Sequence, residues 1–138
     1  MIDPLPPGCS LTTLPVRGDV RGSLVAIESN REAPFDLNRV FYIYGTDPGA
    51  ERGNHAHREF REIAIAVAGE CTITLDDGKD QVGVRLDDPA KALTIAPSVW
   101  RVMKDFSSDC VLLVLTNAPY DETDYIRDYA EFLRIARA

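Results

Sequence analysis

The sequence of 138 residues is poor in several kinds of residue, and each shortage excludes a class of protein. Its three cysteines, Cys9, Cys71 and Cys110, are widely spaced and form no C-x-x-C pair, which is typical of a reduced cytoplasmic protein and not of a disulfide scaffold. No apolar run approaches the roughly 20 residues that a membrane helix needs. Residues 1–10 lack the basic and apolar regions of a secretory signal. We therefore expect a cytoplasmic protein that does not bind membranes.

Positive charge is also scarce. There are 15 lysines and arginines against 22 acidic residues, which leaves a net charge of −7. A protein that binds nucleic acid as a polymer needs a clustered basic face, so we expect no such partner. The length favours a single domain over residues 1–138, and 45% apolar residues are enough to build a core.

Short apolar runs separated by turn signals fill the middle of the chain. The run RVFYIY at 39–44 is rich in aromatic and β-branched residues, and Asp76-Asp77-Gly78 is a hairpin signal. The runs cover residues 24–28, 39–44, 63–68, 71–75, 82–86, 93–95, 102–103 and 111–116. This spacing, with no helical period between the runs, predicts an antiparallel β-barrel.

The two ends of the chain have different patterns. Four prolines within the first 15 residues exclude a helix there, so residues 1–20 are expected to form at most an edge strand or a strand exchanged with another subunit. Near the other end, Asp121 can cap a helix, and apolar residues recur at helical spacing. These residues are Ile126, Tyr129, Ala130 and Leu133. We therefore predict a C-terminal helix over about residues 123–138.

The only two histidines of the chain lie within three residues, His55-Ala56-His57. On a strand, residues i and i+2 point to the same face, at a backbone separation of roughly 6.5–7 Å. Two such imidazoles can bind one metal ion or flank one small group of reacting atoms. The alternative is a pair of surface histidines without a function.

The residues around this pair form a longer pattern. Gly49, His55, His57, Glu62 and Gly69 follow the spacing G-x5-H-x-H-x4-E-x6-G. All five positions match the first signature of the cupin superfamily, so the chain resembles a cupin. The resemblance implies an all-β fold, the double-stranded β-helix or jelly-roll barrel, which agrees with the strand pattern above.

A second cupin signature, P-x-G-x-x-H, normally adds a histidine to a metal site. Here the corresponding stretch is APSVWR at 96–101, and Arg101 stands in place of that histidine. Arginine stays protonated and cannot bind a metal ion. His55, His57 and Glu62 remain as a possible metal set. We favour an enzyme without metal or other cofactor, in which the histidines transfer protons near neutral pH.

Further stretches resemble one family of cupins, the sugar-nucleotide 3,4-ketoisomerases that act on dTDP-4-oxo-6-deoxy-D-glucose. The matching stretches are RGSL (21–24), IE (27–28), PF (34–35), RV (39–40), RG-x-H-x-H (52–57), P-x-VW (97–100), DF (105–106), DCV (109–111) and YDETDYIR (120–127). They follow the family order over nearly the whole chain.

This resemblance implies a reaction in deoxysugar and glycan biosynthesis, such as that of lipopolysaccharide or S-layer glycans. A 4-keto sugar becomes a 3-keto sugar by acid–base proton transfer through an enediol. We expect His55 to be the main base and His57 to relay a proton or donate it to oxygen, although the reverse assignment stays open. The alternatives are a metal-dependent cupin enzyme that uses His55, His57 and Glu62, and a non-catalytic cupin that binds a sugar nucleotide.

The resemblance also implies a site for the nucleotide. Arginine suits a diphosphate through bidentate contacts, and Arg39 and Arg52 are the best candidates. Trp100 is expected to stack on thymine or sugar, unless it belongs to the core. Arg21 and Arg101 are expected to border the sugar. Family members look like homodimers that exchange N-terminal strands, and we expect the same here.

One departure concerns a hydroxyl group. The family commonly has two tyrosines after Arg-Val, whereas this chain has Phe41 followed by Tyr42. If the first hydroxyl assists proton transfer, then Tyr42, Tyr44 or a water must replace it.

Overall fold

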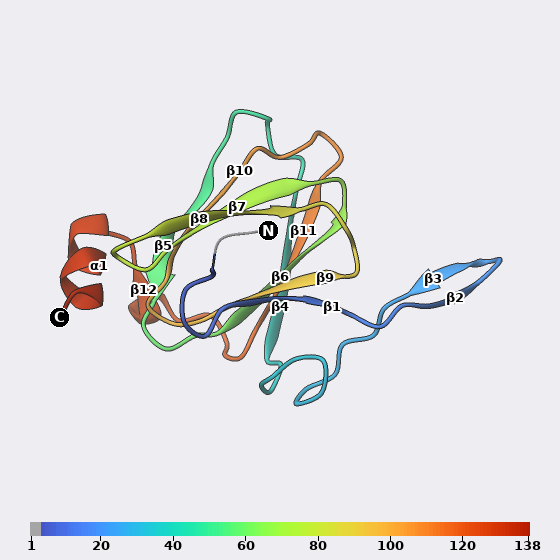
Figure 1. Ribbon diagram of the computed structural model, residues 1–138, viewed down its shortest axis with the longest axis horizontal. Helices are drawn as coiled ribbons and strands as arrows, with labels where there is room; N and C mark the ends of the chain where they lie inside the picture. The colour runs from blue at the N-terminus through green and yellow to red at the C-terminus, as the bar shows by residue number, and fades with distance from the viewer. Residues whose placement is uncertain (1–3) are drawn as a thin grey trace.

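The computed structural model describes residues 4–138, and residues 1–3 of the predicted N-terminal segment lie outside the described part. Two antiparallel sheets pack face to face as a barrel, with one helix at the C-terminal end (Figure 1). The elements are β1 (Ser10–Thr13), β2 (Arg17–Asp19), β3 (Gly22–Leu24), β4 (Arg39–Tyr44), β5 (Arg52–His57), β6 (Glu62–Ala68), β7 (Cys71–Asp76), β8 (Gln81–Leu86), β9 (Lys91–Ile95), β10 (Trp100–Lys104), β11 (Val111–Thr116), the 3₁₀ turn η1 (Glu122–Asp124), β12 (Tyr125–Ile126) and α1 (Tyr129–Ala136).

The strand order is that of a jelly roll. The first sheet runs β1-β9-β6-β11-β4 and the second β12-β5-β10-β7-β8, with antiparallel neighbours throughout. The all-β cupin fold predicted from the sequence is confirmed. The strands β4 and β11 have the predicted bounds, because RVFYIY and VLLVLT are compact, mainly apolar runs flanked by turns.

The core lies between the two sheets. In β8 the residues Val82, Val84 and Leu86 are buried and their neighbours are exposed, which is the period-2 pattern of a strand with one wet face. The inward residues of β6, β7, β9 and β11 complete one continuous apolar cluster. Removing this surface from water stabilises the barrel and holds the two sheets in a fixed register.

The N-terminal part provides an edge strand and a projecting hairpin. Strand β1 pairs with β9 of the same chain, from Ser10 opposite Thr94 to Thr13 opposite Lys91. The β2–β3 hairpin then extends away from the barrel and is exposed along its length (Figure 1). The strand expected over residues 24–28 is wrong beyond Leu24, because residues 25–28 have no regular structure.

The C-terminal helix begins six residues later than predicted. Asp121 caps only η1, whereas the Asp128 side chain accepts hydrogen bonds from the backbone N–H groups of Ala130 and Glu131 and so starts α1 at Tyr129. Between these two caps, β12 extends the second sheet beside β5. Within residues 4–138, no helix has the length and apolarity needed to cross a membrane.

Candidate active site

A cavity of about 480 Å³ opens at the end of the barrel where β4, β5 and β12 meet. Its size is typical of a site for a small organic ligand. Its lining residues are Arg39, Phe41, Tyr42, Ile43, Glu51, Arg52, Gly53, His55, Glu62, Met103, Tyr125 and Arg127. Apolar walls and three arginines therefore surround one histidine and one buried carboxylate.

A distortion of β5 orients His55. Gly53 and Asn54 both have positive φ, 86° and 55°, and a Cβ at Gly53 would lie 3.0 Å from the backbone oxygen of Arg101. Glycine accepts this conformation without strain, and asparagine tolerates it better than most residues. The register against β10 shifts at the same place, between Arg101 and Val102. Such a bulge re-aims the following side chain, here that of His55.

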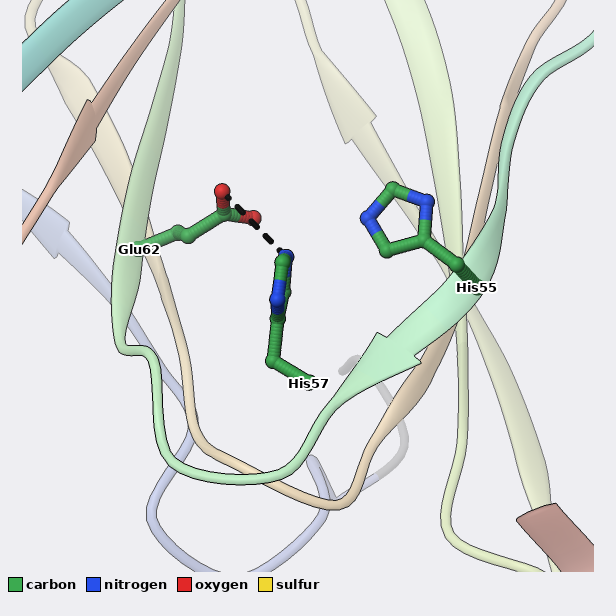
Figure 2. A group of neighbouring side chains, drawn as sticks. All are labelled: His55, His57 and Glu62. Carbon is green, nitrogen blue, oxygen red and sulfur yellow. Dashed lines mark ion pairs between the residues drawn. The ribbon is translucent and has the colours of Figure 1, made fainter. Parts of the chain in front are cut away.

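The predicted histidine pair is present, but its members lie at different depths. The ring centres of His55 and His57 are 4.8 Å apart, edge to face (Figure 2). His55 lines the cavity, whereas His57 is fully buried between Phe60, Tyr125 and Glu62. Nδ1 of His55 and Nε2 of His57 have no hydrogen-bond partner among the described residues. Buried polar atoms are normally paired, so these two unpaired nitrogens are candidates for proton transfer.

A buried ion pair forms the floor of the site. Nη1 of Arg101 is 2.6 Å from Oε1 of Glu62, and Nη2 donates a hydrogen bond to the Val99 carbonyl at 2.9 Å. The other carboxylate oxygen, Oε2, is 3.6 Å from Nε2 of His57. Burial opposes the charge on Glu62, but the contact with His57 and the charge of Arg101 outweigh burial and lower the pKa of the carboxyl to about 2. Glu62 is therefore a carboxylate.

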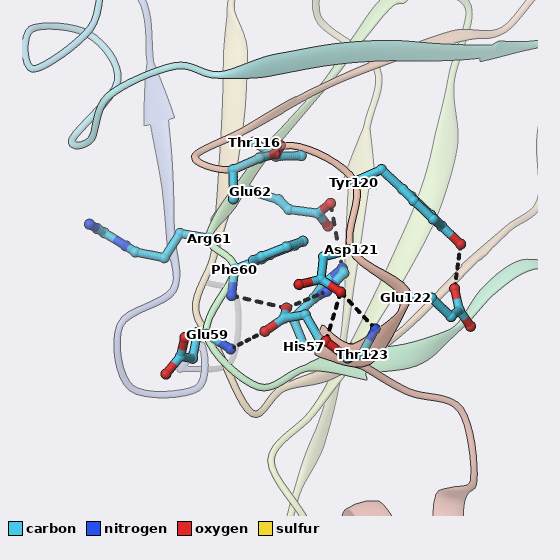
Figure 3. A network of polar contacts seen from close by, with 12 residues as sticks. His57, Glu59, Phe60, Arg61, Glu62, Thr116, Tyr120, Asp121, Glu122 and Thr123 are labelled. Atoms are coloured by element: carbon cyan, nitrogen blue, oxygen red, sulfur yellow. Dashed lines mark hydrogen bonds and ion pairs between the residues drawn. The ribbon is translucent and has the colours of Figure 1, made fainter.

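Asp124, at the end of η1, holds His57 from the other side. Its Oδ2 atom is 3.0 Å from Nδ1 of His57, and the carboxylate also accepts the backbone N–H groups of Glu59 at 2.9 Å and Phe60 at 3.2 Å. Figure 3 shows the polar network around His57. A carboxylate can only accept hydrogen bonds, so Nδ1 of His57 is the N–H that donates the hydrogen bond to Asp124.

The environment of His55 makes it a neutral imidazole. Burial is the main cause, and the positive charge of Arg101 adds to it, so that the pKa of His55 falls to about 4. Neutral histidine accepts a proton, which is the state that a general base requires. The negative charge of Glu62 opposes this shift only weakly, so it does not restore the ordinary pKa of His55.

Some predicted binding residues do not reach this cavity. Trp100 packs outside the barrel against Tyr129 and Phe132 of α1, so it belongs to an apolar cluster and its predicted stacking on the ligand is wrong for this structure. Arg21 lies near the tip of the projecting hairpin, paired with Asp19. Arg101 is fully buried and lies under the cavity, where its guanidinium forms an ion pair with the Glu62 carboxylate.

The two predicted tyrosines of β4 face outward. Tyr42 and Tyr44 are 61% and 70% exposed, because the inward positions of this strand are Arg39, Phe41 and Ile43. Tyr42 still lines the cavity, whereas Tyr44 does not. Tyr44 is therefore not placed in this cavity to replace the hydroxyl missing at Phe41, and that role for Tyr42 stays a prediction.

Three residues of this site were not predicted from the sequence, and all belong to the run YDETDYIR. Asp124 orients His57, Tyr125 packs on both histidines, and Arg127 lines the cavity. The sequence predicts a helix from about residue 123, which would include the second half of this run. In the structure the run crosses the cavity wall as η1 and β12.

A metal ion does not fit the three potential ligands well. The ligand atoms of His55, His57 and Glu62 lie within 4.8 Å of one another. However, Arg101 places a permanent positive charge 2.6 Å from the Glu62 carboxylate. A divalent cation would have to displace or repel that charge in a buried site. The donor set is therefore better suited to proton transfer than to a metal.

Comparison with known proteins agrees with this geometry. Residues 7–137 match the family model described as FdtA, WxcM-like, C-terminal. The chain belongs to this family. It is 49% identical over 114 residues to the TDP-4-oxo-6-deoxy-α-D-glucose 3,4-oxoisomerase of Aneurinibacillus thermoaerophilus, which covers 83% of this chain and 82% of the relative.

Solved structures support the same assignment. A histidine-to-asparagine mutant of the 3,4-ketoisomerase QdtA from Thermoanaerobacterium thermosaccharolyticum, in complex with TDP-4-keto-6-deoxyglucose, matches with a TM-score of 0.94 at 37% identity, over 96% of each chain. The TDP-quinovose 3,4-ketoisomerase WlaRB of Campylobacter jejuni matches at 0.89 and 44%, over 93% of this chain and 98% of that one. The predicted resemblance to sugar 3,4-ketoisomerases is confirmed.

The first prediction concerns the pH dependence of the reaction. Because the pKa of His55 is lowered to about 4, the base stays neutral well below pH 6.5. We expect kcat/KM to fall only as pH approaches about 4, since protonation of the base removes activity. The measurement is a pH profile with circular dichroism at each pH as the control for folding. A decline centred near the ordinary histidine value, with the fold intact, would contradict this assignment.

The second prediction concerns Asp124. In Asp124→Asn one acceptor oxygen becomes a donor facing the N–H groups of His57 or the backbone. We expect a loss of about 1–3 kcal/mol in the free energy of unfolding, measured in urea, because a buried donor is left unpaired. Asp121→Asn is the matched control, since asparagine caps as well as aspartate, and it should change stability little. Equal effects of the two variants would refute the proposed role of Asp124.

Proposed function

We propose that this protein is an isomerase that converts a dTDP-4-keto-6-deoxyhexose into the dTDP-3-keto-6-deoxyhexose in deoxysugar biosynthesis. The observation that carries the proposal is a neutral His55 on the cavity wall, beside the buried Arg101–Glu62 ion pair and a His57 held by Asp124. A base is thereby presented to the substrate without a metal or redox cofactor. The isomerisation needs only that a proton and the carbonyl character exchange between adjacent carbons.

In this mechanism His55 removes the proton from C3 and later returns it to C4. His57 cannot touch the sugar directly, because it is fully buried. It holds its position through Asp124 and presents Nε2 toward Glu62, which lines the cavity. His57 therefore acts only through its neighbours His55 and Glu62. It relays protons and does not contact the substrate.

The nucleotide diphosphate is bound by arginines at the cavity wall. Arg39 and Arg52 line the cavity, and Nη1 of Arg39 is buried without a hydrogen-bond partner among the described residues. The guanidinium of Arg39 is held over the Phe41 ring at 4.7 Å from its centre. A preordered guanidinium with a free donor is suited to a phosphate oxygen.

The active form is a cytoplasmic homodimer in which the projecting hairpin reaches the partner. Val20 and Leu24 of the hairpin are exposed, as are Val40 and Tyr44 on the outer face of β4. Apolar patches of this kind are typical of protein interfaces. Arg21, in the turn between β2 and β3, does not line the cavity of its own chain, so any contact with the sugar would be in the cavity of the partner.

The third prediction tests the reaction itself. The protein is incubated with dTDP-4-oxo-6-deoxyglucose in heavy water and the sugar is followed by NMR. We expect a 3-keto product that carries deuterium at C4, because the proton held on His55 exchanges with solvent before it is returned, and a loss of at least about 100-fold in rate for His55→Asn. Binding of dTDP without turnover would indicate a non-catalytic binding protein. A stoichiometric bound metal ion, with activity lost on chelation, would support the metal-dependent alternative.

The fourth prediction tests the shared site by mixing two inactive variants, Arg21→Ala and His55→Asn. In a mixed dimer one cavity has His55 from one chain and Arg21 from the other, so we expect recovery of about a quarter of the parent activity. Each variant alone is the control, and sedimentation confirms the dimer. No recovery in a mixture shown to contain mixed dimers would mean that Arg21 does not act across the interface.

A further inference from the structure

Of the five tyrosines of the chain, one is both half-buried and part of the cavity wall. Tyr42, Tyr44 and Tyr120 are more than half exposed. The hydroxyl of Tyr129 donates a hydrogen bond to Asp76 at 2.5 Å, beneath α1. Tyr125 is the remaining tyrosine of the chain, and it is half-buried in the cavity wall.

Strand pairing turns Tyr125 toward the histidines. In the antiparallel pair of β12 and β5, Tyr125 lies directly opposite His57, so the two side chains share a face of the sheet. His55, two residues before His57, projects on the same side. The Tyr125 ring centre lies 4.9 Å from that of His55 and 4.5 Å from that of His57. The phenol ring is therefore packed against the base.

Positive charge surrounds this phenol. The guanidinium of Arg127 lies over the ring, 4.3 Å from its centre, and is itself held by Glu122 at 2.6 Å. On the barrel side, the phenol is within electrostatic range of the buried Arg101. Tyr120, whose ring centre is 5.6 Å away, is the neighbour on the outer side. Two guanidinium groups therefore lie near the phenol, one over its ring and one on the barrel side.

We propose that Tyr125 is a catalytic residue that moves the proton between the two oxygens of the sugar, while His55 moves the proton between the two carbons. This role rests on the proposed isomerisation. Phe41, on the opposite wall, has no hydroxyl for this task.

The step conserves protons and electrons within the sugar and these two residues. His55 takes the proton from C3, the C3=C4 bond forms, and the Tyr125 hydroxyl gives its proton to the oxygen on C4. The resulting enediol then loses the proton of the oxygen on C3 to the tyrosinate. As the carbonyl forms at C3, His55 returns its proton to C4. Both residues end in their starting states, so no cofactor is consumed.

The fifth prediction is a kinetic comparison of two matched variants. Tyr125→Phe keeps the ring that packs on the histidines but removes the hydroxyl. We expect kcat to fall by about 100-fold or more, with KM and dTDP affinity within about threefold of the parent, because only a proton-transfer group is lost. Tyr129→Phe also loses one hydroxyl, away from the cavity, and should keep its activity. A kcat within about threefold of the parent for Tyr125→Phe would overturn the proposal.

A second measurement covers the case in which Tyr125→Phe folds poorly. Site-specific replacement of Tyr125 by 3-fluorotyrosine keeps the shape and hydroxyl but makes the phenol more acidic. If the phenol transfers a proton, the alkaline limb of the kcat profile moves to lower pH. An unchanged alkaline limb in a folded, active fluorinated protein would show that the hydroxyl does not take part. Isomerisation by the parent enzyme, measured in parallel, separates this failure from failure of the proposed function.

Discussion

The buried contact between Arg101 and Glu62 is the constraint on which the rest of the site depends. A guanidinium and a carboxylate without solvent are costly to bury, and removing one partner leaves an uncompensated charge. Here the pair joins β10 to β6 across the barrel, and Glu62 also faces His57 on β5. Burial lowers the pKa of Arg101, while the charge of Glu62 opposes that change. The pair thus keeps a positive charge close to His55 without exposing it to the ligand.

The same arrangement separates two histidines that the sequence presents as equivalent. Asp124 accepts a hydrogen bond from Nδ1 of His57, and a Glu62 oxygen lies 3.6 Å from Nε2, so a carboxylate stands on each side of the ring. His55 has no such carboxylate contact and feels mainly burial and the positive charge of Arg101. One imidazole is therefore held inside the barrel, and the other is a neutral group on the cavity wall, the one that we propose as the base. Two groups of one chemical type acquire different roles through their surroundings.

Features determined by neighbouring residues could be predicted from the sequence, whereas contacts between residues far apart in the chain could not. The strands β4 and β11 have the predicted bounds because a short apolar run with turns on either side is a local signal. The His55–His57 pair was predicted from its H-x-H spacing and from the resemblance to the first cupin signature, although no apolar run marked β5 as a strand. The contact of His57 with Asp124 joins residues 67 positions apart, and that of Arg101 with Glu62 joins residues 39 positions apart. No local periodicity encodes such contacts, which form only when the sheets close on each other.

The error at the C-terminal end has a physical cause of the same kind. Ile126, Tyr129 and Leu133 follow helical spacing, yet the Asp128 cap starts the helix after Ile126. The two residues of β12 gain strand pairing with β5 and bury Ile126 beside Ala56, which outweighs the local helical pattern. That choice is what places Tyr125 opposite His57. Had the helix begun at Thr123, the phenol would follow a helical face and not the face of β5, so the interruption of the helix is a condition for the cavity wall to carry chemistry.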